Sequence, residues 1–169
     1  MTGRRRVVAA VLVVTALLLQ LVLVNGLGLP GGPPNLVLAV VLSLALVEGP
    51  GPGMAYGFVG GLLGDALSSH AFGRLALAWT VVCYLAGLVA PSDRFDERPI
   101  IVPIVVTAAL SGVATLGFAA LAVVAGSAHE ATTRIVEQAL AVTVYGAIMA
   151  PFVYLFVRVL LGRLDAVRA

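Results

Sequence analysis

The chain has 169 residues, of which 61% are hydrophobic and only 11% charged, and its mean hydropathy is +1.11. Soluble domains carry about 25% charged residues, so this composition excludes a soluble globular domain and predicts an integral membrane protein. The length fits a single transmembrane domain, residues 1–169, with no room for a soluble catalytic domain. The net charge of +2 comes from arginines at the ends of apolar segments, which form no basic stripe for nucleic acid.

The first predicted element is a spanning helix over residues 7–24. Arg4, Arg5 and Arg6 precede this run, and Thr15 and Gln20 interrupt it. A cleaved signal peptide also begins with basic residues, but its apolar core has about 7–15 residues and a small-residue cleavage site follows it. This run is longer and no such site follows, so we expect an uncleaved helix.

The second and third predicted elements cover residues 34–47 and 54–72. The apolar part of the second, residues 36–47, would be ~18 Å long as a helix, against a hydrocarbon core of ~30 Å. The sequence EGPGPG at 48–53 predicts a turn, because Pro and Gly do not continue a helix there. The two elements are either short tilted spans or a re-entrant hairpin, and both alternatives return the chain to the same side.

Three further spans are predicted at residues 75–90, 100–125 and 139–161. Between them, residues 91–99 form a polar loop, and the polar segment 126–138 is predicted to contain a short interfacial helix around Ile135 and Val136. The last span contains Pro151, which predicts a kink. The expected fold class is therefore an all-α integral membrane protein with six short transmembrane helices in one bundle.

The arginines predict the orientation of this bundle. Six spans place both termini and the loops at 48–53 and 91–99 on one side of the membrane. That side holds eight of the ten arginines, and only Arg74 and Arg134 fall outside it. The positive-inside rule then places both termini in the cytoplasm.

Glycines follow one face of the third predicted helix. At 100° per residue, Gly53, Gly57, Gly60 and Gly64 lie in one narrow stripe, with Gly61 beside it. In lipid, such a small-residue face lets another backbone approach closely. The neighbour is either a helix of the same chain or a helix of a partner protein, and the sequence leaves both alternatives open.

Asp65 borders this glycine face. An ionised Asp at the centre of a lone spanning helix costs ~2.5–3.5 kcal/mol, so it must be paired, protonated or near the interface. One interpretation is structural: Asp65 accepts hydrogen bonds from Ser68 or Ser69, or from backbone groups where the next helix begins. The other is functional: Asp65 fixes the outer mouth of the bundle, where a partner helix or a small ligand docks. Arg74 is the nearest charge able to pair with it.

These arguments define the candidate site residues. The partner-binding set is Gly57, Phe58, Gly61, Gly64 and Asp65, and the outer polar rim is Ser68, Ser69 and Arg74. The intramembrane polar residues are expected to bond to their own helices; these are Gln20, Ser43, Thr80, Ser111, Thr115, Thr143 and Tyr145. Cys83 is alone, and no metal, cofactor or nucleophile motif is present. We therefore expect no enzyme, no cofactor and no metal site.

The run GFVGGLLGDALSSHAFG at residues 57–73 resembles the signature of the rod shape-determining protein MreD family. The matching positions are Gly57, Phe58, Gly61, Leu62, Asp65 and Gly73. The length, the six short spans, the Pro-Asn-Leu start of the second helix and the segment 150–160 are also similar to the family. One departure is Gly146, which stands where the family often has an Asn five residues before the Pro of the last helix, so no role of that Asn is carried over.

The resemblance implies a bacterial inner-membrane, multi-pass component of the cell-elongation machinery. Such a protein would bind MreC, a single-span protein, and through it influence the RodA glycosyltransferase and its class B penicillin-binding transpeptidase, alongside MreB filaments. The family is also similar in fold to the substrate-binding S components of energy-coupling-factor vitamin transporters, which supply the alternative function. An S component would retain a bound small molecule on purification, whereas a scaffold would co-purify with a single-span protein.

Overall fold

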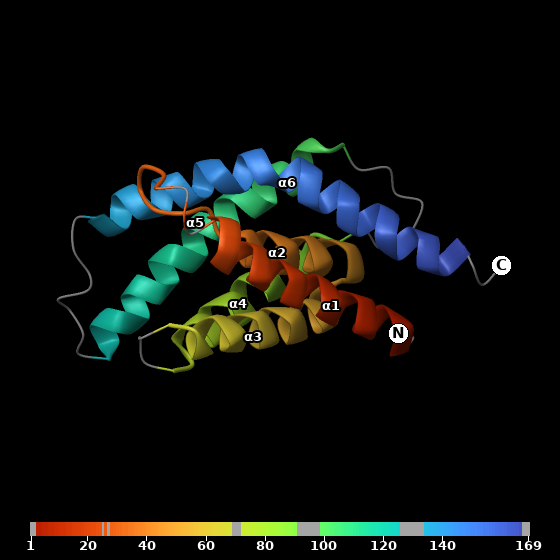
Figure 1. Ribbon diagram of the computed structural model, residues 1–169, viewed down its shortest axis with the longest axis horizontal. Helices are drawn as coiled ribbons and strands as arrows, with labels where there is room; N and C mark the ends of the chain where they lie inside the picture. Colours follow the sequence, from red (N-terminus) through yellow and green to blue (C-terminus); the bar gives the residue numbers. More distant parts are fainter. Residues whose placement is uncertain are drawn as a thin grey trace.

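The computed structural model describes residues 3–24, 26, 28–68, 72–90, 99–125 and 134–166. These residues form six α-helices and one π-helical turn, with no strand among them, which confirms the predicted all-α membrane fold (Figure 1). The elements are α1 (Gly3–Leu19), the π-helical turn η1 (Gln20–Val24), α2 (Leu36–Glu48), α3 (Pro50–Ala66), α4 (Arg74–Leu88), α5 (Ile101–Val124) and α6 (Arg134–Ala166).

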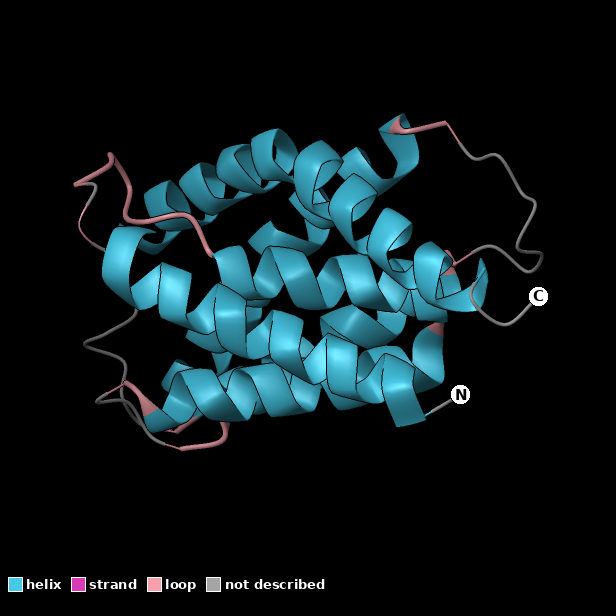
Figure 2. Ribbon diagram, turned by 45° about the vertical axis from the view of Figure 1, so that its right-hand side comes forward, coloured by secondary structure: helices cyan, strands magenta, loops and turns pink. Residues whose placement is uncertain are grey.

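The helices differ in their ability to cross a bilayer. The segments Gly3–Val22, Ile101–Val124 and Ile135–Leu164 are long and apolar enough to span, whereas α2 and α4 are shorter apolar helices. With 13 and 15 residues, α2 and α4 are about 20 and 23 Å long, less than the ~30 Å hydrocarbon core. Figure 2 shows the described connections gathered at the two ends of the bundle, as expected when the backbone inside the membrane must be helical.

The centre of the bundle is α2. It contacts all five other helices, and the ten consecutive residues 37–46 are buried. A helix that is apolar on every side is suited to such a position, because it has no polar face to turn outward. Ser43 is the polar residue in this stretch, and its hydroxyl donates to the carbonyl of Ala39 at 2.7 Å. The short second helix is thus enclosed by protein.

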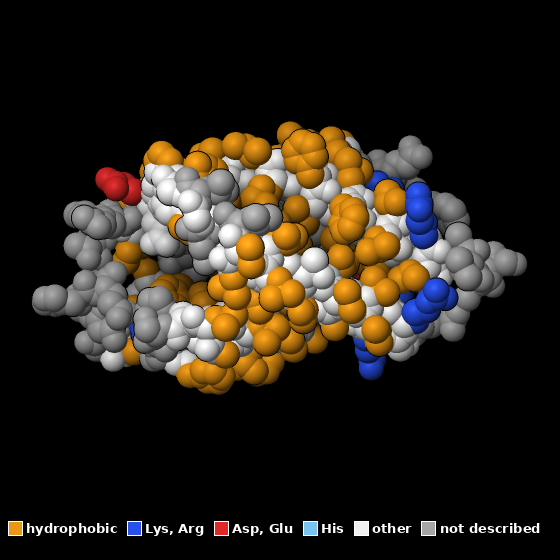
Figure 3. All heavy atoms as spheres, viewed as in Figure 1, with side chains coloured by type: hydrophobic (Ala, Val, Ile, Leu, Met, Phe, Trp, Pro, Cys, Tyr) orange, Lys and Arg blue, Asp and Glu red, His pale blue; other side chains and the backbone are white. Residues whose placement is uncertain are grey.

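The outer surface of the bundle is apolar along its middle. Figure 3 shows hydrophobic side chains forming a broad band, with arginine side chains gathered at the end where α1 begins and α6 ends. Exposed large hydrophobic side chains lie on α1, α3, α4, α5 and α6, among them Val11, Phe58, Val105 and Phe152. An exposed apolar surface of this extent fits contact with lipid.

The turn predicted for residues 48–53 is shorter than expected. Only Gly49 separates α2 from α3, and it takes a φ of 93°, which a side chain would strain. Pro50 and Pro52 then lie in the first turn of α3. The prediction that α3 begins near residue 54 was wrong because the first turn of a helix has no need of its N–H groups and so accepts proline.

Two further boundaries differ from the predictions. The described part of the segment 126–138, residues 134–138, belongs to α6 and forms no separate interfacial helix, and α6 continues through Pro151 to Ala166. Figure 1 shows α6 bowed along its length. The third helix ends at Ala66 instead of residue 72. The loop 91–98, residues 126–133 and Ser69 lie outside the described residues.

Candidate functional site

Asp65 joins the end of α3 to the beginning of α4. The residue is 2% exposed, and its carboxylate accepts three backbone hydrogen bonds: Oδ2 from Gly73 at 2.9 Å and from Ala76 at 3.1 Å, and Oδ1 from Leu75 at 3.1 Å. The first N–H groups of a helix have no partner within it and attract negative charge. The sequence offered serine hydroxyls or backbone groups of the next helix as partners for Asp65. The structure shows hydrogen bonds to the backbone groups.

The predicted outer rim has its own contacts. The Ser68 hydroxyl donates to the carbonyl of Gly64 at 2.7 Å, so it bonds to its own helix end rather than to the Asp65 carboxylate. Arg74, the first residue of α4, is 8% exposed, and its guanidinium lies 5.4 Å from the centroid of the Phe118 ring on α5. A cation over an aromatic face is stabilising at this distance. The Arg74 contact therefore ties α4 to α5 at the same end of the bundle.

The glycine face of α3 is covered by α4 of the same chain. A Cβ atom on Gly57 would lie 2.4 Å from the carbonyl oxygen of Trp79, and one on Gly61 would lie 2.5 Å from the Cα atom of Ala76. Both contacts are with backbone, which cannot move away as a side chain can. The neighbour that the sequence left open is thus intrachain, and the assignment of Gly57 and Gly61 as partner-facing is corrected: α4 already occupies the space in front of them.

The remaining members of the predicted partner-binding set lie differently. Gly64 is only partly buried, and a Cβ there would meet the Cδ1 atom of Leu75 at 3.3 Å. Phe58 is 50% exposed on the outer face of α3. Of the five residues in this set, Phe58 is therefore the one whose side chain projects away from the bundle.

A cavity of about 330 Å³ opens at the Asp65 end of the bundle. Its wall includes residues of α2, α3, α4, α5 and α6, with Trp79 and Phe118 as aromatic members. Its polar members are Gln20, Asn35, Ser68, Thr115 and Gln138. The volume is at the lower end of the range of about 300–1,000 Å³ that is usual for small-molecule sites.

Most polar groups around this cavity already hold the backbone. Gln20 Nε2 donates to the carbonyl of Pro34 at 2.9 Å, while its Oε1 accepts from the N–H of Leu36 at 2.7 Å. Asn35 Oδ1 accepts from the N–H of Leu38 at 2.9 Å, as an N-cap of α2. The cavity therefore has several polar side chains, but those of Gln20 and Asn35 hold the start of α2.

The expectation that polar residues bond to their own helices is confirmed in part. Ser43, Thr80, Thr115 and Thr143 each donate to a carbonyl four residues earlier. Gln20 and Tyr145 do not follow it, because the Tyr145 hydroxyl donates to the carbonyl of Pro30 at 2.9 Å and Gln20 bonds the start of α2. Both fasten the connection between α1 and α2.

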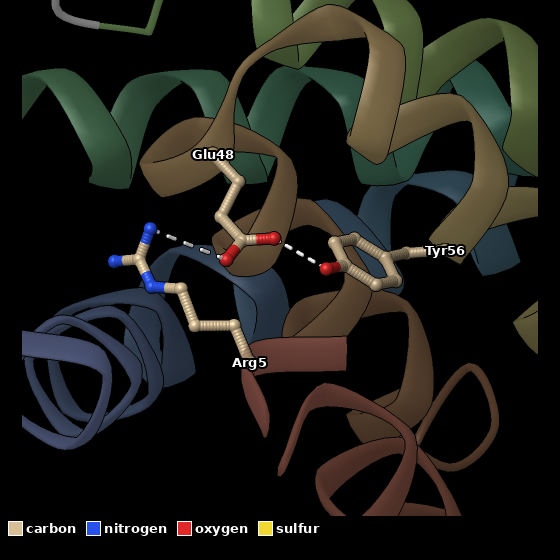
Figure 4. A network of polar contacts seen from close by, with 3 residues as sticks. All are labelled: Arg5, Glu48 and Tyr56. Carbon is tan, nitrogen blue, oxygen red and sulfur yellow. Dashed lines mark hydrogen bonds and ion pairs between the residues drawn. The ribbon is translucent and has the colours of Figure 1, made fainter. Parts of the chain in front are cut away.

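A second polar cluster lies at the opposite end and was missed in the sequence. Glu48 closes α2, and its side chain is 1% exposed. Its Oε1 lies 3.7 Å from Nη1 of Arg5, and its Oε2 accepts a hydrogen bond from the Tyr56 hydroxyl (Figure 4). This Arg5–Glu48–Tyr56 network joins α1, α2 and α3. The sequence did contain a signal for this network: Glu48 is a carboxylate at the end of an apolar run, and three arginines lie on the same predicted side of the membrane.

The polar side chains around Asp65 and around Glu48 have structural roles. Among the described residues, no group of three or more His, Cys, Asp or Glu side chains is placed to hold a metal ion. The buried carboxylates accept hydrogen bonds from backbone N–H groups and from a phenol, and that of Glu48 also forms an ion pair with a guanidinium. Such contacts hold helices in fixed positions relative to one another.

The fold and these contacts define an integral membrane protein of packed helices whose buried polar side chains fasten one helix to the next. The chain belongs to the family of the rod shape-determining protein MreD, which matches residues 4–163. Membership assigns it a role in rod-shape determination, in a family of shape-determining membrane proteins. No curated protein and no solved structure matches the chain.

Proposed function

We propose that this protein is a non-enzymatic scaffold of the bacterial cell-elongation machinery in the cytoplasmic membrane, with both chain ends in the cytoplasm. The proposed direct partner is an MreC-like single-span protein, and through it the scaffold acts on a RodA glycosyltransferase and its class B penicillin-binding transpeptidase, alongside MreB filaments. The orientation rests on the arginines gathered at the end where α1 begins and α6 ends (Figure 3).

The observation that carries this proposal is the use of the buried polar groups. Asp65, Gln20 and Glu48 each contact groups of the protein's own helices, so the contacts named at both ends serve to hold the bundle. A scaffold needs a stiff frame with apolar outer faces, because helix association in lipid depends mainly on packing. The outer face of α3 around Phe58 is such a surface, and we propose that the partner's helix packs there.

A tagged-protein pull-down in mild detergent tests this proposal. We expect the wild type to co-purify with a single-span protein that has an extracytoplasmic domain, and Phe58→Ala to reduce the recovery several-fold. Phe152→Ala is the matched control, since Phe152 is an exposed Phe on α6. Equal recovery with both variants would show that Phe58 is not part of the interface. If no single-span protein co-purifies with the wild type, the scaffold proposal is wrong.

The cavity at the Asp65 end favours a second candidate, the S component of an energy-coupling-factor vitamin transporter. Such a protein needs an outward cavity lined by polar and aromatic groups, and this cavity has Trp79, Phe118 and several amides. The existing bonds of Gln20 and Asn35 weigh against it, because a solute would have to compete with the backbone of α2. Mass spectrometry of the same purified sample decides: a retained vitamin-like solute with ATPase subunits would establish transport instead.

A further inference from the structure

A groove runs between α1 and α3 on the outside of the bundle. The two helices touch each other at few places, and the space between them has a volume of about 550 Å³. Its walls are apolar along most of its length; they include Ala10, Val14, Ala55, Val59 and Leu63. At the end nearer the beginning of α1, the groove is bordered by Arg6 and Tyr56.

The three consecutive arginines of α1 are used in different ways. Successive residues of a helix point about 100° apart, so Arg5 turns toward the bundle and pairs with Glu48, while Arg4 and Arg6 turn away on either side and are exposed. Of these two, Arg6 borders the groove. The pairing of Arg5 with Glu48 (Figure 4) therefore fixes the rotation of α1. This rotation brings Arg6 to the mouth of the groove.

From this arrangement we propose that the groove between α1 and α3 binds an anionic phospholipid. One acyl chain lies along the apolar walls, and the phosphate pairs with Arg6 at the mouth. A guanidinium matches phosphate in both charge and hydrogen-bond geometry. In a membrane protein this groove opens toward lipid. Its apolar walls suit an acyl chain and its charged end suits a negative headgroup, so an anionic amphiphile fits the whole groove.

The size of the groove favours a lipid chain over a protein helix. An α-helix with its side chains is about 10–12 Å wide, so 550 Å³ would hold only about one helical turn. The same volume lies well within the range of about 300–1,000 Å³ that encloses a small molecule. A partner helix would rest on the rim of this groove, whereas an acyl chain enters it.

A second outer groove provides an internal comparison. It lies between α1, α2 and α6, has a volume of about 370 Å³, and is lined by residues such as Thr15, Val40 and Phe156. None of its lining residues is charged. This groove offers an acyl chain the same apolar contact without a partner for the phosphate, so it should not distinguish one headgroup from another.

Native mass spectrometry of the purified protein tests the proposal. The protein in detergent is given equal amounts of phosphatidylglycerol and phosphatidylcholine with identical acyl chains. We expect the wild type to bind phosphatidylglycerol about fivefold more tightly, because the choline ammonium of phosphatidylcholine offsets the phosphate charge that Arg6 meets. This is the ratio for a single arginine contribution of about 1 kcal/mol. Arg6→Gln should remove this preference, and Arg4→Gln, which removes the same charge outside the groove, should keep it.

Variants that fill one groove or the other test whether the lipid binds inside the groove or is held only by the surface charge of the protein. Ala55→Phe narrows the groove between α1 and α3 and should lower the binding of phosphatidylglycerol several-fold, whereas Thr15→Phe, in the uncharged groove, should leave the preference unchanged. Equal loss with Arg4→Gln and Arg6→Gln, or unchanged binding with Ala55→Phe, would overturn the proposal. Loss of a co-purifying single-span protein with Ala55→Phe, at unchanged lipid binding, would assign the groove to a helix instead.

Discussion

The helix α3 contacts its neighbours α4 and α1 in two different ways. Toward α4, α3 presents glycines and one carboxylate, and what they meet is mostly backbone: the Trp79 carbonyl, the Ala76 Cα atom and three N–H groups. Toward α1, it leaves a groove of about 550 Å³, and its Tyr56 and the Arg5 side chain of α1 both contact the Glu48 carboxylate. The first contact follows α3 from Gly57 to Asp65, whereas the polar contact with α1 lies at one end of the bundle.

The difference shows which parts of the bundle are able to move. Backbone groups in contact have no rotamers to change, so α3 and α4 form one rigid unit with a single register. Side-chain contacts at one end of a groove allow small changes of angle between the helices they join. We therefore expect α1 to be the adjustable helix of this bundle and the pair α3 and α4 to be its fixed part.

Replacing Asp65 should have the largest effect. Asp65→Ala leaves three backbone N–H groups without an acceptor, that of Gly73 just before α4 and those of Leu75 and Ala76 in its first turn. At about 1–3 kcal/mol for each group, we expect the free energy of unfolding to fall by about 3–5 kcal/mol. The measurement is unfolding in mixed detergent followed by the fluorescence of Trp79, the single Trp of the chain, which faces this contact. Ser68→Ala, which removes a hydroxyl bonded to its own helix, should cost under about 1 kcal/mol. Equal losses for both variants would show that the carboxylate does not hold α4.

Adding one methyl group to the glycine face should have the next largest effect. Gly61→Ala places a Cβ 2.5 Å from the Cα atom of Ala76, so α3 and α4 must separate, and we expect a loss of about 2–3 kcal/mol. Gly64→Ala is the matched control, because its Cβ meets the mobile end of Leu75 at 3.3 Å and should cost under about 1 kcal/mol. The same Trp79 assay measures both variants. A Gly61→Ala protein as stable as the wild type would mean that α3 and α4 are not fixed against each other.

The smallest effect is expected at the contact with α1. A double-mutant cycle of Arg5→Met and Glu48→Gln isolates the ion pair, and we expect a coupling energy of about 1 kcal/mol. The 3.7 Å separation and the partial exposure of Arg5 keep this value modest. A parallel cycle with Arg4→Met, whose side chain is exposed, should give coupling near zero. A coupling energy that rivals the loss in Asp65→Ala would place α1 in the rigid unit as well.

The sequence predicted six helices because each contains an apolar run, long or short, that is bounded by polar or turn-forming residues. It placed the start of α3 too late, since Pro50 and Pro52 are usual turn residues yet also fit a first helical turn. It placed a short interfacial helix around Ile135 and Val136 in the polar segment 126–138, since that polarity gave no sign that α6 begins before the apolar run. Periodicity is of little use for α2, because a helix that is apolar on every side has no periodic face.

The site was predictable where its contacts are local. Asp65 bonds groups eight to eleven residues away, and helix-start chemistry pointed to them. The neighbour of the glycine face was ambiguous, since small residues invite a close backbone without saying which one. Glu48 was missed because its partner Arg5 lies on a different helix, far away in the sequence, and only the packing of α1 on α2 brings the two together.

The enclosure of α2 also has a consequence for the order of synthesis. The chain makes α2 early, but α6, one of the helices that cover it, begins at residue 134, which is 86 residues after α2 ends at residue 48. At about 5–20 residues per second, α2 waits for about 4–17 s before that neighbour exists. Hydrocarbon can surround it in the meantime, because its side chains are apolar and the one hydroxyl in its buried stretch is bonded within the helix. The residues that later form the core of the protein can thus reside in lipid first.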